Sequence, residues 1–309
     1  MLLAIIAIGL LLQGALGFSE SPSREFDFSK HNVPLEHILS GGPSKDGIPA
    51  ILNPAFVSAS DAGFLDVQDR VLGVVEGDEA KAYPIKILNW HEIVNDRLGG
   101  KPVLVTYCPL CGSGIGFDPV VNGRLLTFGV SGLLYQSDMV MYDHQTESLW
   151  SQISMEAIAG SMTGTKLHHL FLEHTTWSEW QQRYPGTLVL STKTGHHRDY
   201  DRDPYLGYAQ RADLMVPLKQ PDSRFHSKEW VLGLEVEGSF KAYPFSELEK
   251  VDSPLLDHIH GQPVRIHYQA RAHSVSVTDQ EGTPLPSVMA FWFAWSIFHP
   301  EMDVFIVEE

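Results

Sequence analysis

Short stretches of apolar and β-branched residues predict strands along much of the chain. Residues 103–107 alternate weakly and are rich in valine, so they predict a buried strand that ends at Cys108. Residues 117–130 predict a strand, a tight turn and a second strand, because Asn122-Gly123 is typical of a type I′ turn. The pattern therefore favours sheets with hairpin connections.

Other segments predict a further hairpin and two helices. Residues 140–142 and 149–150 are apolar and flank a polar turn, which is typical of a hairpin. Residues 83–96 place apolar side chains roughly on one face of a helix, and residues 177–183 predict a second helix that stops before Pro185. The predicted fold class is α+β, β-rich and mainly antiparallel, with helices between sheets.

Two segments of the chain resemble each other. VLGVVEGDEAKAYPIKIL, at residues 71–88, is similar to VLGLEVEGSFKAYPFSEL, at residues 231–248. The similarity continues from residues 99–111 to residues 260–272, and later Trp180 aligns with Trp295. We therefore predict two related units that share a fold.

The two units differ at the residues that carry chemistry. Three residues of the first unit change in the second: Cys108, Cys111 and His91 become Gln269, Ala272 and Val251. Their joint loss is expected if they form one site that the second unit does not need, and the alternative is independent drift. We predict that the second unit is degenerate.

The predicted organisation has four parts. Residues 1–17 contain an apolar run followed by Ala-Leu-Gly, which is typical of a signal peptide. An N-terminal segment (18–64), a Cys-containing first unit (65–215) and a degenerate second unit packed on the first (216–309) follow. We expect a secreted or periplasmic protein, with membrane association only if the N-terminal segment is not cleaved.

Composition is that of an ordinary globular protein, with 43% hydrophobic and 19% charged residues. The formal net charge is -16, and no basic cluster is present that could follow a phosphate backbone. Nucleic acid is therefore not an expected partner.

The chain contains only two cysteines, Cys108 and Cys111, in the stretch Tyr-Cys-Pro-Leu-Cys-Gly. In redox chemistry Cys108 would be the nucleophile and Cys111 the resolving thiol, with His91 tuning the thiolate or moving a proton. As a metal site, the pair would need further ligands, such as His91 with His196 or His197, to hold zinc, or fewer to hold copper(I). An inert crosslink is less favoured because so short a loop removes little unfolded-state entropy.

The strings YPIKILNWHEIVND, TYCPLCGSGIGFD, FGVSGLLYQSDMVMYDHQTESLWSQ and TGHHRDYDRDPY resemble the bacterial and archaeal family called domain of unknown function 3179. The resemblance covers most of the chain after residue 17. Some members of that family carry selenocysteine in the thiol motif, which implies redox use of this position. The family has no settled activity to transfer.

Two hypotheses about function follow. In the first, the chain is an exported thiol-dependent redox protein that uses Cys108, Cys111 and His91 on a small-molecule or protein thiol or disulfide and requires no cofactor. In the second, it binds or delivers zinc or copper through Cys108, Cys111, His91 and His196.

Overall fold

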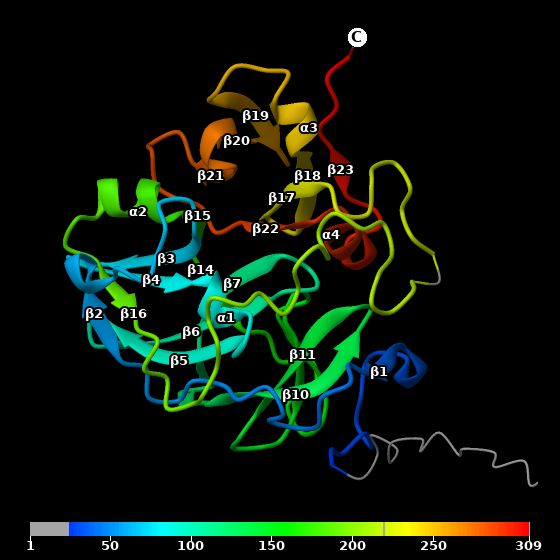
Figure 1. The fold of residues 1–309 in the computed structure, drawn as a ribbon. Helices are drawn as coiled ribbons and strands as arrows, with labels where there is room; N and C mark the ends of the chain where they lie inside the picture. The colour runs from blue at the N-terminus through cyan, green and yellow to red at the C-terminus, as the bar shows by residue number, and fades with distance from the viewer. Residues whose placement is uncertain (1–24, 219, 309) are drawn as a thin grey trace, which may run out of the picture.

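The computed structural model describes residues 25–218 and 220–308. Within them, five small sheets are arranged as a five-bladed β-propeller with little helix (Figure 1). Most neighbouring strands pair in antiparallel fashion. The β-rich, mainly antiparallel architecture expected from the sequence is confirmed. The predicted signal peptide at residues 1–17 lies outside the described residues.

Blades 1 to 3 combine strands from the first two thirds of the chain. In spatial order, blade 1 contains β1 (Ile38–Ser40), β10 (Phe128–Tyr135), β11 (Asp138–Asp143), β12 (Leu149–Ser151) and β13 (Glu156–Ala159). Blade 2 contains β14 (His168–Leu170), β7 (Ser113–Asp118), β6 (Lys101–Cys108) and β5 (Ile93–Leu98). Blade 3 contains β15 (Glu173–Thr176), β3 (Arg70–Glu76), β4 (Glu79–Pro84), β16 (Leu188–Leu190) and β2 (Phe56–Ser58).

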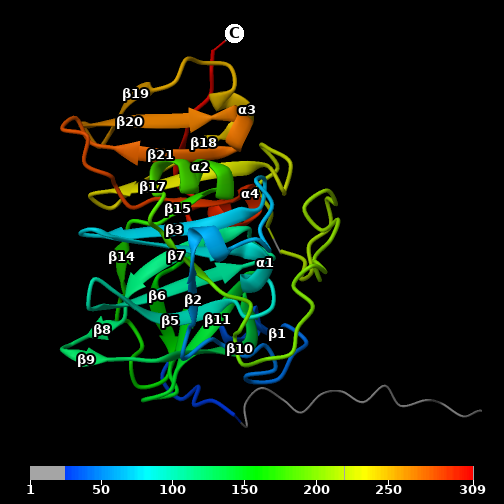
Figure 2. The ribbon, with the colours of Figure 1, turned by 60° about the vertical axis from the view of Figure 1, so that its left-hand side comes forward.

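Blades 4 and 5 are formed by the C-terminal part of the chain. Blade 4 contains β22 (Val288–Phe291), β17 (Trp230–Val236), β18 (Ser239–Pro244) and β23 (Asp303–Val304). Blade 5 contains β19 (Leu255–Ile259), β20 (Gln262–Gln269) and β21 (Ser274–Thr278). Figure 2 shows blade 5 at one end of the molecule and β10 and β11 of blade 1 towards the other.

The remaining elements are short. A separate ribbon contains β8 (Val120–Val121) and β9 (Arg124–Leu125). The α-helices of the described residues are α1 (Ile85–Leu88), α2 (Trp177–Arg183), α3 (Phe245–Leu248) and α4 (Trp292–Phe298). The 3₁₀ helices are η2 (Leu35–His37), η3 (Ala59–Asp61) and η4 (Ala270–Ala272). None of the helices in this part of the chain is long and apolar enough to cross a membrane.

The similar sequence segments adopt the same local structure. We call β3, β4, α1, β5, β6 and β7 the first copy, and β17, β18, α3, β19, β20 and β21 the second copy. Val71 pairs with Pro84 in the first copy as Val231 pairs with Pro244 in the second. Each copy is then completed by a strand, a helix and a parallel strand: β15–α2–β16 and β22–α4–β23. The domain boundaries proposed from the sequence stay a prediction.

A tyrosine shared by both copies anchors each one through a buried hydrogen bond. The Tyr83 hydroxyl donates to Asp96 Oδ2 at 2.7 Å, and the Tyr243 hydroxyl donates to Asp257 Oδ2 at 2.9 Å. In each copy a lysine also bonds the same carboxylate oxygen. The Lys-Ala-Tyr-Pro motif is therefore explained by the fold.

The shared tryptophans pack on shared glycines. A Cβ atom at Gly73 would overlap the ring of Trp180, and one at Gly233 would overlap the ring of Trp295. Both tryptophans are almost completely buried. Glycine is therefore required at these two positions by the close approach of an indole ring to the strand.

The helix predicted over residues 83–96 is wrong. Tyr83 and Pro84 end β4, only α1 is helical, and β5 starts at Ile93. Glu92 has a positive φ of 57°, which prevents the helix from continuing. Strand pairing of Tyr83 with Leu72 and of Ile93 with Thr106 outweighs the helical spacing of the apolar residues.

Other local predictions are confirmed. Residues 103–107 lie within β6, and residues 177–183 coincide with α2. Asn122 and Gly123 both have positive φ, as a type I′ turn requires, and they connect β8 with β9. β11 and β12 form the predicted hairpin.

The largest apolar core lies between blades 1, 2 and 4 and includes both cysteines. Its aromatic side chains include Phe128 and Trp150 from blade 1 and Phe117 from blade 2. Trp292 and Trp295 come from α4, which follows β22 of blade 4. The thiols are therefore placed where several sheets meet and water is excluded.

Candidate functional site

The thiol loop is the tight connection between two neighbouring strands of blade 2. Cys108 is the last residue of β6 and pairs with Ser113, the first residue of β7. The Cys111 N–H donates to the Cys108 carbonyl oxygen at 3.2 Å, which folds the loop. Gly112 has a φ of +66°, and a Cβ there would lie 2.6 Å from the Trp230 ring. The glycine after Cys111 is thus required by both the backbone and the neighbouring ring.

A carboxylate from blade 1 completes the cluster. Asp138 begins β11, and the Cys111 thiol lies 3.7 Å from Asp138 Oδ1 and 3.4 Å from the Ser137 carbonyl oxygen. One ligand atom from each of Cys108, Cys111 and Asp138 lies within 4.8 Å of the others. The three residues are all buried. They form what we call the Cys-Cys-Asp site.

Asp138 is held in position by donors on the next strand and turn. Its Oδ2 accepts hydrogen bonds from Ser151 Oγ at 3.1 Å and from the Ile153 N–H at 3.0 Å. Burial raises the pKa of Asp138 to about 7, and the hydrogen bonds from Ile153, Ser151 and Cys111 limit this rise. The carboxylate is therefore oriented towards the loop before any ligand binds.

A second buried carboxyl group, that of Glu92, lies close to the Cys-Cys-Asp site. Glu92 has its pKa raised to about 8, mainly by burial and then by the nearby charge of Asp138. Burial also raises the pKa of the Cys111 thiol, and the hydrogen bond and charge of Cys108 add to this. Within the described part of the chain, none of the groups that shift Asp138 or Glu92 is a cation. Asp138 and Glu92 are thus buried together without a positive partner, whereas Cys111 interacts with the charge of Lys228.

Cys108 and Glu92 line one small cavity of about 70 Å³. Apolar side chains, including Met139 and Met215, form much of its wall, and Tyr205 also contributes. The cavity has room for about two water molecules. Cys108 therefore borders an internal space although its exposed fraction is only 1%, and Cys111 is completely buried.

His91 belongs to a different hydrogen-bonded cluster. Its Nδ1 donates to the Pro49 carbonyl oxygen at 2.7 Å, and its Nε2 accepts from the Tyr200 hydroxyl at 2.7 Å. Tyr200 in turn bonds Thr194 Oγ1 at 2.6 Å. Burial lowers the pKa of His91 to about 4, so the ring is neutral. Both ring nitrogens are occupied by these partners.

The two histidines of the sequence hypotheses lie beside each other. The ring centroids of His91 and His196 are 5.4 Å apart. Among the residues that the structure describes, the only group with metal-binding geometry contains Cys108, Cys111 and Asp138, and no histidine. The structure thus brings the cysteines together and groups the histidines separately. A role of His91 in thiol chemistry stays a prediction.

Sequence reasoning missed Asp138 and Glu92. Asp138 lies in the stretch Gln-Ser-Asp-Met-Val-Met-Tyr, where it is a single acidic residue before an apolar strand, and the second unit has no counterpart of this stretch. That signal could have identified Asp138 as a candidate. Glu92 follows His91 directly, but nothing in the sequence indicates that its side chain is buried.

A family model described as "Protein of unknown function (DUF3179)" matches residues 45–302. The chain belongs to this family. The resemblance inferred from the sequence motifs is therefore confirmed. Neither the curated proteins nor the solved structures gave a match.

Proposed function

We propose that the protein binds a borderline metal ion, Zn²⁺ in the first place, through Cys108 Sγ, Cys111 Sγ and a carboxylate oxygen of Asp138. One observation carries the proposal: three ligand atoms of the types that zinc prefers lie within 4.8 Å of one another in a buried site. Buried ionised groups are normally paired or bound to a metal. A bound cation would supply positive charge to Asp138 and Glu92, whereas Lys228 acts on Cys111.

The spacing supports zinc geometry. Tetrahedral coordination with Zn–S bonds of about 2.3 Å places two sulfur ligands about 3.8 Å apart. The thiols sit on a tight loop, and Asp138 is fixed by Ser151 and Ile153, so binding requires only small side-chain movements. A fourth ligand would come from Glu92 or from water in the cavity that Cys108 and Glu92 share.

Charge favours Zn²⁺ over Cu⁺. Two thiolates and one carboxylate carry three negative charges when all are ionised. Zn²⁺ leaves one of these charges uncompensated and Cu⁺ leaves two, and each uncompensated buried charge is costly. Carboxylate oxygen is also a poorer ligand for the softer Cu⁺.

Thiol–disulfide exchange is the second candidate function. The loop brings the two thiols close together, and Cys108 lines a cavity. In the exchange, a substrate disulfide would take two electrons and two protons from the thiols, leaving two substrate thiols and a Cys108–Cys111 disulfide. We place this function second because both thiols are buried and the cavity at Cys108, of about 70 Å³, leaves no room for a protein disulfide to approach.

We also propose that the protein works outside the cytoplasm. The support is the apolar run at residues 2–12 followed by a small-residue site at residues 15–17. Mass spectrometry of the protein from an expressing cell measures whether the N-terminus starts after residue 17. An intact N-terminus in a membrane fraction would contradict cleavage and support an uncleaved anchor.

The test of metal binding measures metal and thiols on the same sample. Purified protein is analysed for zinc and copper by mass spectrometry, and free thiols are counted in denaturant with and without reductant. We expect one zinc per chain in the folded parent protein, and two free thiols per chain in denaturant without reductant. Cys108→Ser should lose the zinc.

Asp143→Asn is the matched control for loss of a buried polar group. Asp143 is buried at the other end of β11, where it accepts hydrogen bonds from Trp150 and Thr146. This variant should keep its zinc if it folds. A metal-free parent protein whose cysteines form a disulfide that reductant opens reversibly would overturn the zinc site and favour redox chemistry.

A further inference from the structure

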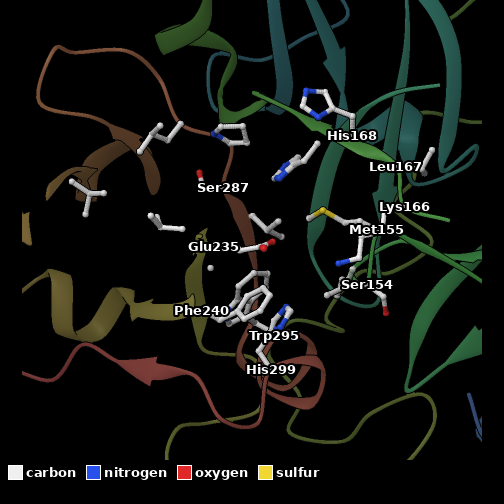
Figure 3. A pocket seen from close by; sticks show the side chains of 18 of the residues that line it. Ser154, Met155, Lys166, Leu167, His168, Glu235, Phe240, Ser287, Trp295 and His299 are labelled. Atoms are coloured by element: carbon white, nitrogen blue, oxygen red, sulfur yellow. The ribbon is translucent and has the colours of Figure 1, made fainter. Parts of the chain in front are cut away.

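A second cavity has a volume of about 510 Å³. Neither Cys108 nor Cys111 is among the residues that line it. It is bordered by blades 1, 2, 4 and 5 and by α4. Figure 3 shows Phe240, Trp295 and His299 grouped on one side, with Met155, Lys166 and His168 across the space. Cavities of this size hold small organic molecules.

Three residues that line this cavity each have a buried nitrogen atom without a hydrogen-bond partner within the described chain. The atoms are His169 Nε2, Trp295 Nε1 and His299 Nε2. Buried polar atoms are nearly always hydrogen-bonded in folded proteins. These atoms have almost no accessible surface as the side chains stand, so a ligand in the cavity would complete their bonding after small rotations of those side chains.

Trp180, the counterpart of Trp295 in the first copy, has a hydrogen-bond partner that Trp295 lacks among the described residues. Trp180 Nε1 donates to Thr187 Oγ1 at 2.9 Å. The residue at the same spacing after Trp295 is Met302, whose side chain has no oxygen. The first copy thus satisfies its indole N–H internally, and the second copy leaves the equivalent N–H without a partner among the described residues.

The next difference lies one helical turn further along. Tyr184 packs against Trp180 with ring centroids 4.3 Å apart, and His299 packs against Trp295 at 4.1 Å. His299 also stacks on Phe240, with centroids 3.9 Å apart and planes at 16°. The second copy therefore has an imidazole where the first copy has a phenol, and the aromatic stack holds that imidazole in place.

We infer that this cavity binds a small, neutral organic molecule with an aromatic body and a carboxamide-type polar group. Trp295 Nε1 can only donate, so the ligand must offer an acceptor such as a carbonyl oxygen. A neutral imidazole nitrogen either donates or accepts, and an amide matches both cases. The wall is largely apolar and aromatic, with Phe240, Trp295 and Leu285 among its residues.

Charge distribution supports a neutral ligand. Lys166 and Glu235, which have opposite charges, are exposed parts of the lining. Burial lowers the pKa of both His169 and His299 to about 4, so neither ring supplies a positive charge at neutral pH. The lining thus carries charges of both signs, Lys166 against Glu235 and Asp279, and favours neither an anion nor a cation.

The experiment follows the indole N–H signals of ¹⁵N-labelled full-length protein by NMR. Trp295→Phe and Trp180→Phe assign the two signals that matter. Benzamide, a neutral amide, is titrated to millimolar concentration, with benzoate and benzylamine as charged comparison probes. We expect benzamide to shift the Trp295 signal and leave the Trp180 signal unchanged, with weaker binding of both charged probes.

His299→Phe tests the site without removing the buried indole. Loss of one hydrogen bond should weaken benzamide binding about tenfold, whereas Cys108→Ser should leave it unchanged because the thiol site is separate. An unshifted Trp295 signal with all three probes would show a water-filled space only and overturn the inference. Unchanged benzamide affinity in His299→Phe would show that His299 makes no bond to the ligand and would also overturn it. Neither result bears on zinc binding.

Discussion

The thiol loop and its counterpart in the second copy have the same backbone plan but different surroundings. Cys108 pairs with Ser113 as Gln269 pairs with Ser274. The left-handed position before the second strand is Gly112 in one loop, at φ 66°, and His273 in the other, at φ 47°. The loop geometry therefore belongs to the fold and does not by itself create a site.

The neighbours of each loop come from the other copy. Trp230, at the start of β17, covers Gly112 and helps to bury the thiol loop. Arg70, at the equivalent start of β3, donates to the carbonyl oxygens of Ala272 and His273. An apolar ring thus covers the loop with the cysteines, and a guanidinium binds the loop without them.

The strongest difference is the carboxylate. Asp138 reaches the first loop from blade 1, and the insert that provides it has no counterpart between β21 and β22. The Cys-x-x-Cys loop is therefore a candidate metal site only because blade 1 packs on it and supplies Asp138.

Removal of this carboxylate should give the largest effect. Asp138→Asn keeps the shape and both cysteines but removes a charged ligand, so we expect zinc affinity to fall by at least about 100-fold. Competition with a chromophoric zinc chelator measures the change. Wild-type affinity in this variant would show that Asp138 is not a ligand.

The converse experiment moves the cysteines to the second loop. Gln269→Cys combined with Ala272→Cys recreates the thiol spacing on the same backbone plan, but no carboxylate corresponds to Asp138. We expect bound zinc to stay at one per chain, measured by metal analysis. A second zinc of similar affinity would mean that the loop alone is sufficient and that the comparison is wrong.

The glycine–tryptophan contacts should respond alike in the two copies. Gly73→Ala and Gly233→Ala each place a methyl group into a buried indole ring, so each should destabilise the protein by about 1–3 kcal/mol. Urea unfolding followed by fluorescence measures this. Gly186→Ala is the control, because a Cβ atom there would meet open space. Gly77→Ala is a poorer control because the φ of Gly77 is positive.

A smaller common effect is expected at the shared tyrosines. Tyr83→Phe and Tyr243→Phe each remove one hydrogen bond to a carboxylate, at Asp96 and Asp257. Each change should cost about 1–2 kcal/mol in unfolding free energy. If Tyr83→Phe instead abolished zinc binding at unchanged stability, this tyrosine would have a functional role that the second copy does not share.

Much of the local structure was predictable because it depends on neighbours in the sequence. The strand that ends at Cys108 and the helix at residues 177–183 follow from side-chain preference and from turn residues. The cysteine pair itself is adjacent in sequence, so the centre of the site could also be found. These features need no knowledge of distant contacts.

What could not be predicted depends on long-range packing. Asp138 meets Cys111 only because blade 1 packs on blade 2, and the buried state of Glu92 has the same origin. His91 shares its sequence region with the helix that was wrongly predicted, and its ring is bound by Pro49 and Tyr200 from elsewhere in the chain. The closure of five blades also rests on contacts that sequence periodicity does not contain.

The smallest predicted difference between the copies is a pH effect of His299. Burial lowers its pKa from 6.5 to about 4 in the folded protein. Between these values the unfolded chain binds a proton that the folded chain does not, so the stability present above pH 6.5 is lost as pH falls towards 4. Tyr184 occupies the equivalent place in the first copy and has a phenol in place of the imidazole.

His299→Tyr makes the second copy like the first and should remove this contribution. The difference in unfolding free energy between variant and parent, measured by urea at pH 7.5 and at pH 5, should shift by on the order of 1 kcal/mol in favour of the variant at the lower pH. Because the comparison is between two pH values, any packing cost of the larger phenol cancels. An identical difference at both pH values would mean that His299 is as easily protonated in the folded protein as in the unfolded chain, and the contrast with Tyr184 would then be one of shape alone.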